Sequence, residues 1–445
     1  MKAVFIVPNS SITFDNKAQN LKFDELWEFR ARERLWSTPN LSLLTMAGML
    51  PQEYQVEYID QNYIEVLDLD YQLAFFSPST SQAYKAYELA DKLRENGVLV
   101  MMGGAHVSVL PQEALKHADA IFIGEAEETF PVFLDDIKRG KPKLIYKSLE
   151  PPNLNLSPVP RYDLAKKFPY KSIPVQTSRG CPHQCNFCIS SKLYGRKIRR
   201  KSIQQVESEL IKIMDLYQNP FIFFTDDNFL RDLEYGRELM NILKKFGLKW
   251  YAFTDASIVD QPDLLENAAK SGCSRLLIGF ESLEPKNLVV INQSKWKLKK
   301  WAQYKQIIAE IQSHGIGVVG SFIVGMDEDT KEVFDILYNF INETCLYATN
   351  ITVLTPFPGT TIYKMLQTEN RITTNDWTKY NGFKLTYTLK SISKHEFERG
   401  FENLSQRLNS SERINNVINY YKEIMNAKIK NKTACDLETQ DEKYP

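Results

Sequence analysis

The sequence lacks several features that would place it in common protein classes. Lys and Arg number 55 and Asp and Glu number 55, so there is no electrostatic case for a nucleic-acid or anionic-membrane partner. The chain contains no run of about 18 apolar residues that could span a bilayer. Met1 leads directly into the strand-like segment Lys2–Val7 without a signal peptide. Six cysteines form no disulfide framework in a chain of this length. We therefore expect a cytoplasmic protein with no membrane span.

Length and composition indicate a globular protein of more than one domain. The 445 residues exceed one ordinary hydrophobic core and suit two or three domains. Apolar residues make up 43% and charged residues 25%, as is typical of globular proteins.

Three of the cysteines are concentrated in one loop, which reads Cys181-Pro-His-Gln-Cys185-Asn-Phe-Cys188. Three thiolates on a tight loop can hold three irons of a [4Fe–4S] cube and leave the fourth iron open. An open iron can bind a small molecule and pass it an electron. The other three cysteines are scattered, and we expect them to be buried or incidental thiols: Cys273, Cys345 and Cys435.

The alternatives to a cluster in this loop are a zinc knuckle and unpaired core thiols. A structural zinc site uses four ligands, so it would need a further Cys or His at matching spacing. His183 lies inside the loop, but the chain has no second C-x2-C pair. The spacing therefore favours the iron–sulfur cluster.

The first 145 residues alternate between short apolar strands and helices. Strands are predicted at 3–7, 56–60, 73–77, 98–102 and 120–123, and helices at 82–95 and 111–117. This pattern predicts an α/β domain with a doubly wound, Rossmann-like parallel sheet. Ligands of such sheets bind at the carboxyl ends of the strands. Those ends carry small and polar residues here: Ser77, Ser79, Thr80, Gly103, Gly104, His106, Gly124 and Glu125.

Residues 146–172 are expected to form a linker, because their proline-rich centre has no periodicity. The alternation then resumes over residues 173–365. Strands are predicted at 173–177, 221–225, 248–253, 275–280, 317–324 and 350–354. Helices are predicted at 202–217, 233–246, 263–271, 297–314 and 328–341. Six βα units predict a partial (β/α)6 barrel of the TIM type, with its chemistry at the carboxyl ends of the strands.

Polar residues also follow the strands of this second region. Thr225, Asp226 and Asp227 come after its second strand. Asp255, Glu281 and Ser321 lie at the ends of the third, fourth and fifth strands. Carboxylates suit a cationic amine. Acidic residues also cap helices, so each of them has a purely structural alternative.

The cysteine loop and these strand ends, in this order, resemble the radical S-adenosylmethionine (SAM) superfamily. Phe187, the aromatic residue before the third cysteine, also fits that family. The resemblance implies that SAM chelates the open iron of a [4Fe–4S] cluster and is cleaved to a 5'-deoxyadenosyl radical. It implies Cys181, Cys185 and Cys188 as cluster ligands, and as SAM-binding residues Phe187, Thr225, Asp226, Asp227, Glu281 and Ser321.

The N-terminal strand ends resemble the cobalamin-binding domain of cobalamin-dependent radical SAM enzymes. The matching features are Ser77, the Gly103-Gly104-x-His106 turn and the Gly124-Glu125-x-Glu127 turn. This resemblance covers residues 1–425. It implies that cobalamin contacts the eight small and polar residues at the ends of the first set of strands.

One loop departs from the classical cobalamin-binding pattern. Classical methyltransferase domains carry D-x-H-x-x-G after the first strand, where the histidine ligates cobalt, but the loop 8–14 has no histidine. We therefore expect no protein histidine at the lower axial position. His106 is the other candidate ligand, although a lone histidine is more often a structural hydrogen-bonding residue.

The C-terminal part of the chain reads differently. Residues 366–426 are expected to form a small helical region in which Trp377, Tyr380 and Tyr387 pack. Residues 427–445 are polar and charged and are expected to be disordered. The segment 14–36, rich in aromatic and charged residues, is expected to be a surface helix or a flap over a cofactor or substrate.

The sequence as a whole predicts a cobalamin-dependent radical SAM enzyme with a [4Fe–4S] cluster, SAM and cobalamin as cofactors. The expected reaction is methylation of an unactivated carbon of a small-molecule or lipid substrate. An external electron donor of the flavodoxin or ferredoxin type is implied. Two alternatives remain: an enzyme that cyclises or rearranges its substrate without methyl transfer, and a non-catalytic regulatory protein that binds a cluster.

Overall fold

Six parallel strands form the sheet of the N-terminal region, in the order β2-β1-β3-β4-β5-β6. The central strands are buried on both faces, as expected of a parallel sheet covered by helices. The doubly wound sheet predicted from the sequence is therefore confirmed. The strands are β1 (Lys2–Val7), β2 (Gln55–Asp60), β3 (Leu73–Phe76), β4 (Leu99–Met102), β5 (Ala120–Ile123) and β6 (Ile145–Lys147). The sequence did not reveal β6, a three-residue strand at the edge of the sheet.

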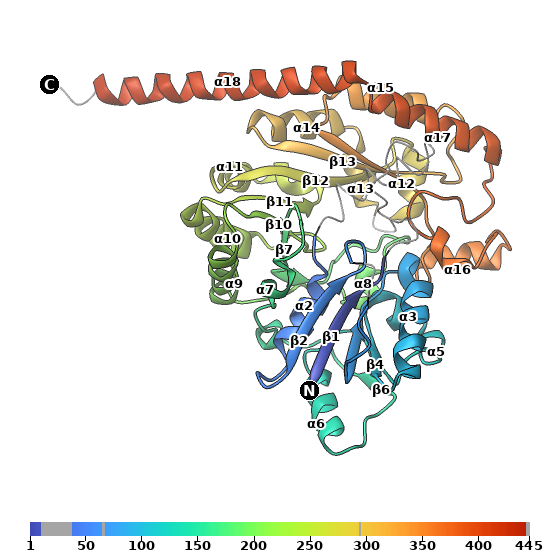
Figure 1. Ribbon diagram of the computed structural model, residues 1–445. Coiled ribbons are helices and arrows are strands. Elements are labelled where there is room, and N and C mark those ends of the chain that lie inside the picture. Colours follow the sequence, from blue (N-terminus) through green and yellow to red (C-terminus); the bar gives the residue numbers. More distant parts are fainter. Residues whose placement is uncertain (10–37, 65–66, 293–294, 442–445) are drawn as a thin grey trace. The chain divides into compact units, whose positions relative to one another are not determined.

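The computed structural model describes residues 1–9, 38–64, 67–292 and 295–441 (Figure 1). The expected surface helix or flap at 14–36 lies outside these residues. Contacts divide the chain into two units. The first contains Met1–Phe229, Val290–Ser294 and Val353–Thr388, and the second contains Leu230–Val289, Lys295–Thr352 and Leu389–Pro445. The first unit thus joins the N-terminal sheet, the expected linker, the cysteine loop and part of the C-terminal region.

Alternation along the strands gives the first sheet two hydrophobic faces. Val4 and Ile6 belong to a core that contains the buried side of α3 (Ala83–Glu95). Phe5 points to the opposite face, where its ring stacks on Phe75 with the centroids 4.6 Å apart. Phe130 of α6 (Thr129–Lys138) packs edge-on against Phe75 there. The other helices around this sheet are α2 (Leu41–Gly48), η2 (Thr80–Gln82), α4 (Gly104–Val109) and α5 (Pro111–Ala114).

A late segment of the chain completes the core of the first unit. Residues 353–388 contain α16 (Thr361–Thr368) and η5 (Trp377–Lys379). Trp377 and Tyr380 are buried and pack into the same core as α3. Tyr387 is also buried. The packing role expected for these three aromatic residues therefore agrees with their burial.

The rest of the first unit carries the cysteine loop. β7 (Ile173–Val175) pairs in parallel with β10 (Phe221–Phe224), and α9 (Ile203–Leu216) lies between them in the sequence. Between β7 and α9, β8 (Ser178–Arg179) and β9 (Arg199–Arg200) form a two-stranded antiparallel hairpin. The cysteines lie in the connection of this hairpin. The shorter helices of this part are η3 (Leu154–Leu156), α7 (Tyr162–Ala165) and α8 (Ser190–Leu193).

The second unit continues the strand–helix alternation. Its strands lie in the order β14-β13-β12-β11, and β12 (Cys273–Glu281) pairs in parallel with β11 (Lys249–Thr254) and β13 (Gly317–Val324). With β7, β10 and β14 (Ala348–Val353), all six strands predicted for the second region are present. The helices here are α10 (Leu233–Phe246), η4 (Ala256–Asp260), α11 (Pro262–Lys270), α12 (Pro285–Ile291), α13 (Trp296–Trp301), α14 (Tyr304–Ser313) and α15 (Val333–Glu343).

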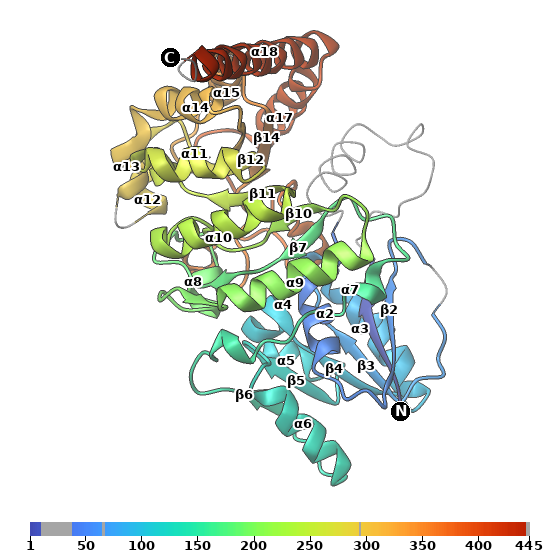
Figure 2. The same cartoon turned by 90° about the vertical axis from the view of Figure 1, so that its left-hand side faces the viewer.

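Two long helices end the second unit. α17 (Lys394–Leu408) lies alongside α15 in both ribbon views (Figures 1 and 2), and Phe397 contacts Phe334 with ring centroids 5.5 Å apart. α18 (Ser411–Asp441) follows it. The helix continues through residues 427–441, where the sequence predicted disorder. No Gly or Pro lies between residues 411 and 441, so nothing in this segment breaks a helix.

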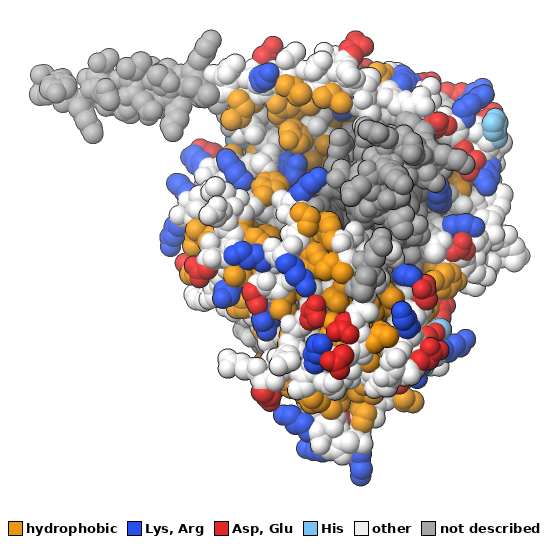
Figure 3. All heavy atoms as spheres, viewed as in Figure 1, with side chains coloured by type: hydrophobic (Ala, Val, Ile, Leu, Met, Phe, Trp, Pro, Cys, Tyr) orange, Lys and Arg blue, Asp and Glu red, His pale blue; other side chains and the backbone are white. Residues whose placement is uncertain are grey.

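The surface agrees with the balanced composition. On the face shown in Figure 3, basic and acidic side chains of the described residues are intermixed. Among the described residues, no helix is both long and apolar enough to cross a membrane.

Candidate active site

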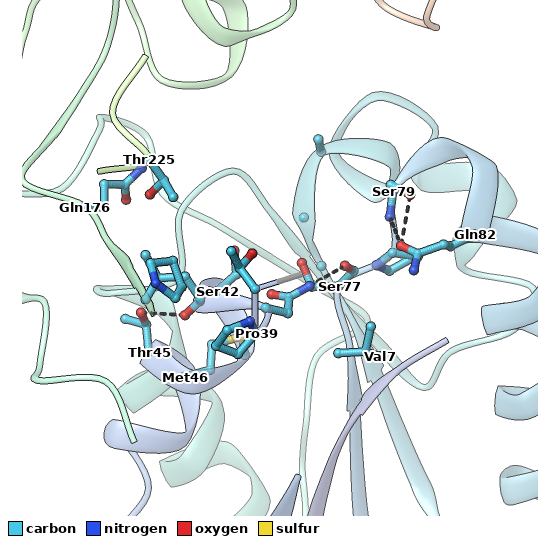
Figure 4. A pocket seen from close by; sticks show the side chains of 18 of the residues that line it. Val7, Pro39, Ser42, Thr45, Met46, Ser77, Ser79, Gln82, Gln176 and Thr225 are labelled. Carbon is cyan, nitrogen blue, oxygen red and sulfur yellow. Dashed lines mark hydrogen bonds between the residues drawn. The ribbon is translucent and has the colours of Figure 1, made fainter. Parts of the chain in front are cut away.

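A large cavity opens at the carboxyl ends of the strands of the first sheet. Its volume is about 1120 Å³, at the upper end of the roughly 300–1,000 Å³ of ordinary ligand pockets, and all of its lining residues belong to the first unit. Figure 4 shows Ser77, Ser79 and Gln82 on one side of it, and Gln176 and Thr225 on another. The cavity is therefore lined both by the ends of the first strands and by residues next to the cysteine loop.

Most residues predicted to contact cobalamin line this cavity: Ser77, Ser79, Gly103, Gly104, Gly124 and Glu125. The position of Gly104 in the fold requires a glycine. Its φ angle is +88°, and a Cβ atom there would lie 2.5 Å from the Ser77 hydroxyl oxygen. Gly124 has a φ angle of +82° but open space around it. Glycines at these turns leave room for a bulky ligand to approach the backbone.

The other two residues of that set, Thr80 and His106, do not belong to the lining of the cavity. His106 is buried, and its ring nitrogens lie 3.3 Å from the Thr80 hydroxyl and 3.3 Å from the Glu113 carboxylate. Trp377 also donates to Glu113 from its indole nitrogen, at 3.1 Å. Burial lowers the pKa of His106, against the opposing effect of Glu113. The structure thus places His106 in a hydrogen-bonded core.

The cysteine loop is shaped by its hairpin. The backbone amide of Cys181 donates to the carbonyl of Gly195, which lies shortly before β9, at 3.3 Å. Gly180 has a φ angle of +100°, and a Cβ atom there would lie 2.4 Å from the Lys197 carbonyl oxygen, so only glycine fits. The glycine that the sequence placed before the first cysteine therefore lets the two sides of the hairpin approach closely.

The three thiols of the loop form no disulfide and are partly exposed. Burial raises the pKa of Cys181 to about 12, and Asp227 and the other two thiols act in the same direction. Cationic iron would offset that cost. Within the described residues, no group of three His, Cys, Asp or Glu side chains is gathered to hold a single metal ion. As a set, the thiols suit a polynuclear cluster, for which three thiolates are a fitting donor set.

Asp226 and Asp227 have different roles in the structure. Asp226 is fully buried, and its carboxylate accepts from the Thr177 amide at 3.0 Å and from the Ser178 hydroxyl at 2.5 Å. Its oxygens therefore fix the start of the hairpin rather than facing the cavity. Asp227 accepts from the Gly180 amide at 3.1 Å and lines the cavity beside Thr225. Burial raises the pKa of both carboxyl groups, that of Asp226 to about 6.

The remaining predicted SAM-binding residues are Phe187, half-buried inside the cysteine loop, and two residues of the second unit. Ser321 lies in β13 and accepts from the Asn350 amide at 3.3 Å. Glu281 ends β12 with a strained φ of +66°, and its carboxylate lies 2.9 Å from the Lys297 ammonium. Asp255, the acidic residue at the end of the third predicted strand, accepts a hydrogen bond from the Ser257 backbone amide at 2.8 Å. It therefore caps η4, which is the structural role that we gave as the alternative to ligand binding.

A buried group of charges next to the cavity was not predicted from the sequence. Arg179 precedes the first cysteine by two residues, and its guanidinium group pairs with Glu125 at 2.6 Å and with Glu127 at 2.7 Å. Arg199 also pairs with Glu125. Only the turn containing the two glutamates stood out in the sequence. The arginines gave no signal, because their partners are more than fifty residues away.

Two families match the chain in the regions that carry these two groups of residues. The B12 binding domain matches residues 32–134, and the Radical SAM superfamily matches residues 175–341. The chain belongs to the cobalamin-dependent radical SAM enzymes. In this family the cofactors are a [4Fe–4S] cluster, SAM and cobalamin, and the three loop thiols and the cavity fit them.

Similar proteins include two methyltransferases and one solved structure. The bacteriochlorophyllide d C-8(2)-methyltransferase of Chlorobaculum tepidum is 28% identical, over 78% of this chain and 80% of that protein. The hopanoid C-2 methylase of Rhodopseudomonas palustris is 27% identical, over 76% of this chain and 66% of that protein. The cobalamin-dependent SAM radical enzyme OxsB superposes with a TM-score of 0.69 at 18% identity, over 91% of this chain. The match spans 65% of OxsB, less than two thirds of its length, and shows the shared fold.

Proposed function

We propose that this protein methylates an unactivated carbon of a small-molecule or lipid substrate. The supporting observation is the cavity of the first unit, where the ends of β3, β4 and β5 and the residues flanking the cysteine loop line one space. A carbon held there would be near both sets of residues. The methyltransferase names of the similar proteins from Chlorobaculum and Rhodopseudomonas support the same reaction class.

The cofactors would supply the chemistry, and the chain's residues would bind and orient them. The cluster and SAM provide the radical that removes a substrate hydrogen, and cobalamin provides the methyl carrier. One turnover converts two SAM molecules to S-adenosylhomocysteine, methionine and 5'-deoxyadenosine. It takes two electrons, which an external donor of the flavodoxin or ferredoxin type would deliver.

The residues of the first unit would divide this work. Cys181, Cys185 and Cys188 would hold the cluster, while Asp226 fixes the hairpin that carries them. Thr225 and Asp227 would face SAM, since a carboxylate suits its ammonium group. The turns at the ends of β3, β4 and β5 would hold cobalamin.

Product analysis with methyl-labelled SAM tests the proposal. Anaerobic, reduced protein is incubated with labelled SAM and candidate lipid or tetrapyrrole substrates. We expect labelled product together with S-adenosylhomocysteine and 5'-deoxyadenosine. Replacing the three loop cysteines by Ala should abolish 5'-deoxyadenosine, whereas Cys273→Ala should retain it. 5'-Deoxyadenosine with an altered but unlabelled product would contradict methylation and favour cyclisation or rearrangement.

A further inference from the structure

Two buried glutamates and two mostly buried arginines form what we call the Glu125–Arg179 network: Glu125, Glu127, Arg179 and Arg199. Its glutamates are almost fully buried, with 3% of each side chain exposed, and the arginines are 12% and 15% exposed. Two positive and two negative charges balance. Burial alone would raise the pKa of Glu127, but the charge and hydrogen bond of Arg179 outweigh it and the pKa is lowered. Glu127 is therefore held in its charged form, and each glutamate has an arginine partner.

The network begins at the cysteine hairpin. Arg179 and Arg199 are direct partners across the antiparallel β8–β9 pair. Like charges in this position repel each other unless an opposite charge lies between them. Glu125 supplies it: one of its carboxylate oxygens accepts from Arg179 at 2.6 Å and from Arg199 at 3.0 Å. Pairing of the two hairpin strands beside the cysteines therefore depends on a carboxylate from another part of the chain.

The network ends at the turn between β5 and α6. This turn carries Glu125 and Glu127, follows Gly124 and lines the cavity. The guanidinium fork of Arg179 contacts both glutamates, and its Nε atom donates to Gln176 at 2.7 Å. All five donor positions of an arginine lie in one plane, so a guanidinium group bound on several sides fixes the relative placement of its partners. A shift of the turn must therefore move the hairpin or break buried ion pairs.

We propose that Arg179 is a positioning residue that couples the cobalamin-facing turn to the cluster-bearing hairpin. The coupling rests on the proposed function's cofactor sites and adds a link between them. Occupation of one site then favours the arrangement of the other, and by thermodynamic linkage the effect is reciprocal. A residue with a merely structural role would change the stability of the fold but would not make the affinity of one site depend on the state of the other.

The test measures the dependence of cobalamin affinity on the cluster. Each variant is prepared anaerobically in a cluster-free and a reconstituted form, and hydroxocobalamin is titrated into both by visible absorbance. In the wild-type chain we expect the two dissociation constants to differ by about fivefold or more, the lower end of typical couplings. In Arg179→Lys, which keeps the charge but loses the fork, we expect their ratio to approach one. Using a ratio removes any direct effect of the substitution on cobalamin binding.

A second buried pair in the same unit provides the matched control. Lys201 and Glu209 are ion-paired with 3% and 1% of their side chains exposed, and neither lines the cavity. Glu209→Gln should keep the wild-type ratio. Glu127→Gln, whose carboxylate pairs with Arg179, should lose it and replaces Arg179→Lys if that variant does not fold.

The outcomes separate this inference from the proposed function. A wild-type ratio near one, or a wild-type ratio retained in both Arg179→Lys and Glu127→Gln, overturns the coupling even if methyl-labelled SAM labels the product. Loss of the ratio in Glu209→Gln as well would show a general stability effect and also overturn it. Failure of the wild-type chain to bind hydroxocobalamin in either form would contradict both proposals. If the two dissociation constants of the wild-type chain differ as expected but methyl-labelled SAM leaves no label in the product, only the methylation proposal is contradicted.

Discussion

The carboxylate of Asp226 binds both the backbone amide and the side-chain hydroxyl of Thr177, at 3.0 Å and 2.7 Å. The contact joins the end of β10 to the residue that leads into the cysteine hairpin. A fully buried carboxylate is costly to ionise, and these donors reduce that cost. Asp226 therefore supports the start of the cysteine hairpin, while its neighbour Asp227 faces the cavity.

Replacing Asp226 by Asn should weaken the cluster site. An amide offers one acceptor oxygen where the carboxylate offered two, so a buried donor of the Thr177–Ser178 segment loses its partner, at a cost of about 1–3 kcal/mol. We expect less iron per chain after anaerobic reconstitution. Asp329→Asn is the matched control, because Asp329 is also buried and accepts two backbone hydrogen bonds, but in the second unit. Normal iron content in Asp226→Asn would contradict a supporting role.

Asp226 should also make stability depend on pH. Its folded-state pKa is raised from 3.8 to about 6, so the folded chain binds this proton more tightly than the unfolded chain does. Its contribution to stability is present below about pH 4 and is lost as the pH rises to about 6. The difference in unfolding free energy between the wild type and Asp226→Asn should change by up to about 3 kcal/mol across this window, with the wild type losing stability. Urea unfolding at several pH values measures it, and a constant difference would refute the pKa assignment.

The Gly104 turn gives a steric test of the cobalamin site. Gly104→Ala places a Cβ atom 2.5 Å from the Ser77 hydroxyl oxygen, and both residues line the cavity. We expect hydroxocobalamin affinity to fall by at least about tenfold, the equivalent of about 1.4 kcal/mol. Gly97→Ala is the control for backbone strain, because Gly97 has a similar φ of +80° with open space around it and does not line the cavity. Equal losses in both variants would show that strain, and not the shape of the cavity, is responsible.

Much of the fold was predictable because the apolar strands are distinct in the sequence. The five N-terminal strands and the six later strands were found within a few residues, since each is a short buried run between helices. Where the prediction differed, the pattern was weak. β6 is short and lies at an edge, and the helix expected over 297–314 is divided into α13 and α14.

The site was only partly predictable, because sequence position does not determine where a side chain points. The spacing of Cys181, Cys185 and Cys188 was enough by itself to predict a cluster-binding loop. Asp226 and Asp227 are adjacent and chemically identical, yet one faces the hairpin backbone and the other the cavity. Arg179 could not be assigned from its neighbours, since its partners Glu125 and Glu127 come from a distant turn.

His106 provides the last prediction, on the ligand environment of cobalt. Among the described residues, no histidine lines the cavity, and the loop after the first strand contains none in the sequence. Both ring nitrogens of His106 are hydrogen-bonded, one to Thr80 and the other to Glu113. We therefore expect the paramagnetic spectrum of protein-bound cob(II)alamin to show no superhyperfine splitting from a protein nitrogen. His106→Gln should leave that spectrum unchanged but lower the free energy of unfolding by about 1 kcal/mol, because the buried ring loses its hydrogen bonds to Thr80 and to the partly exposed Glu113. Splitting that is present in the wild type and absent from His106→Gln would instead identify His106 as the axial ligand, and would require its side chain to leave the core on binding.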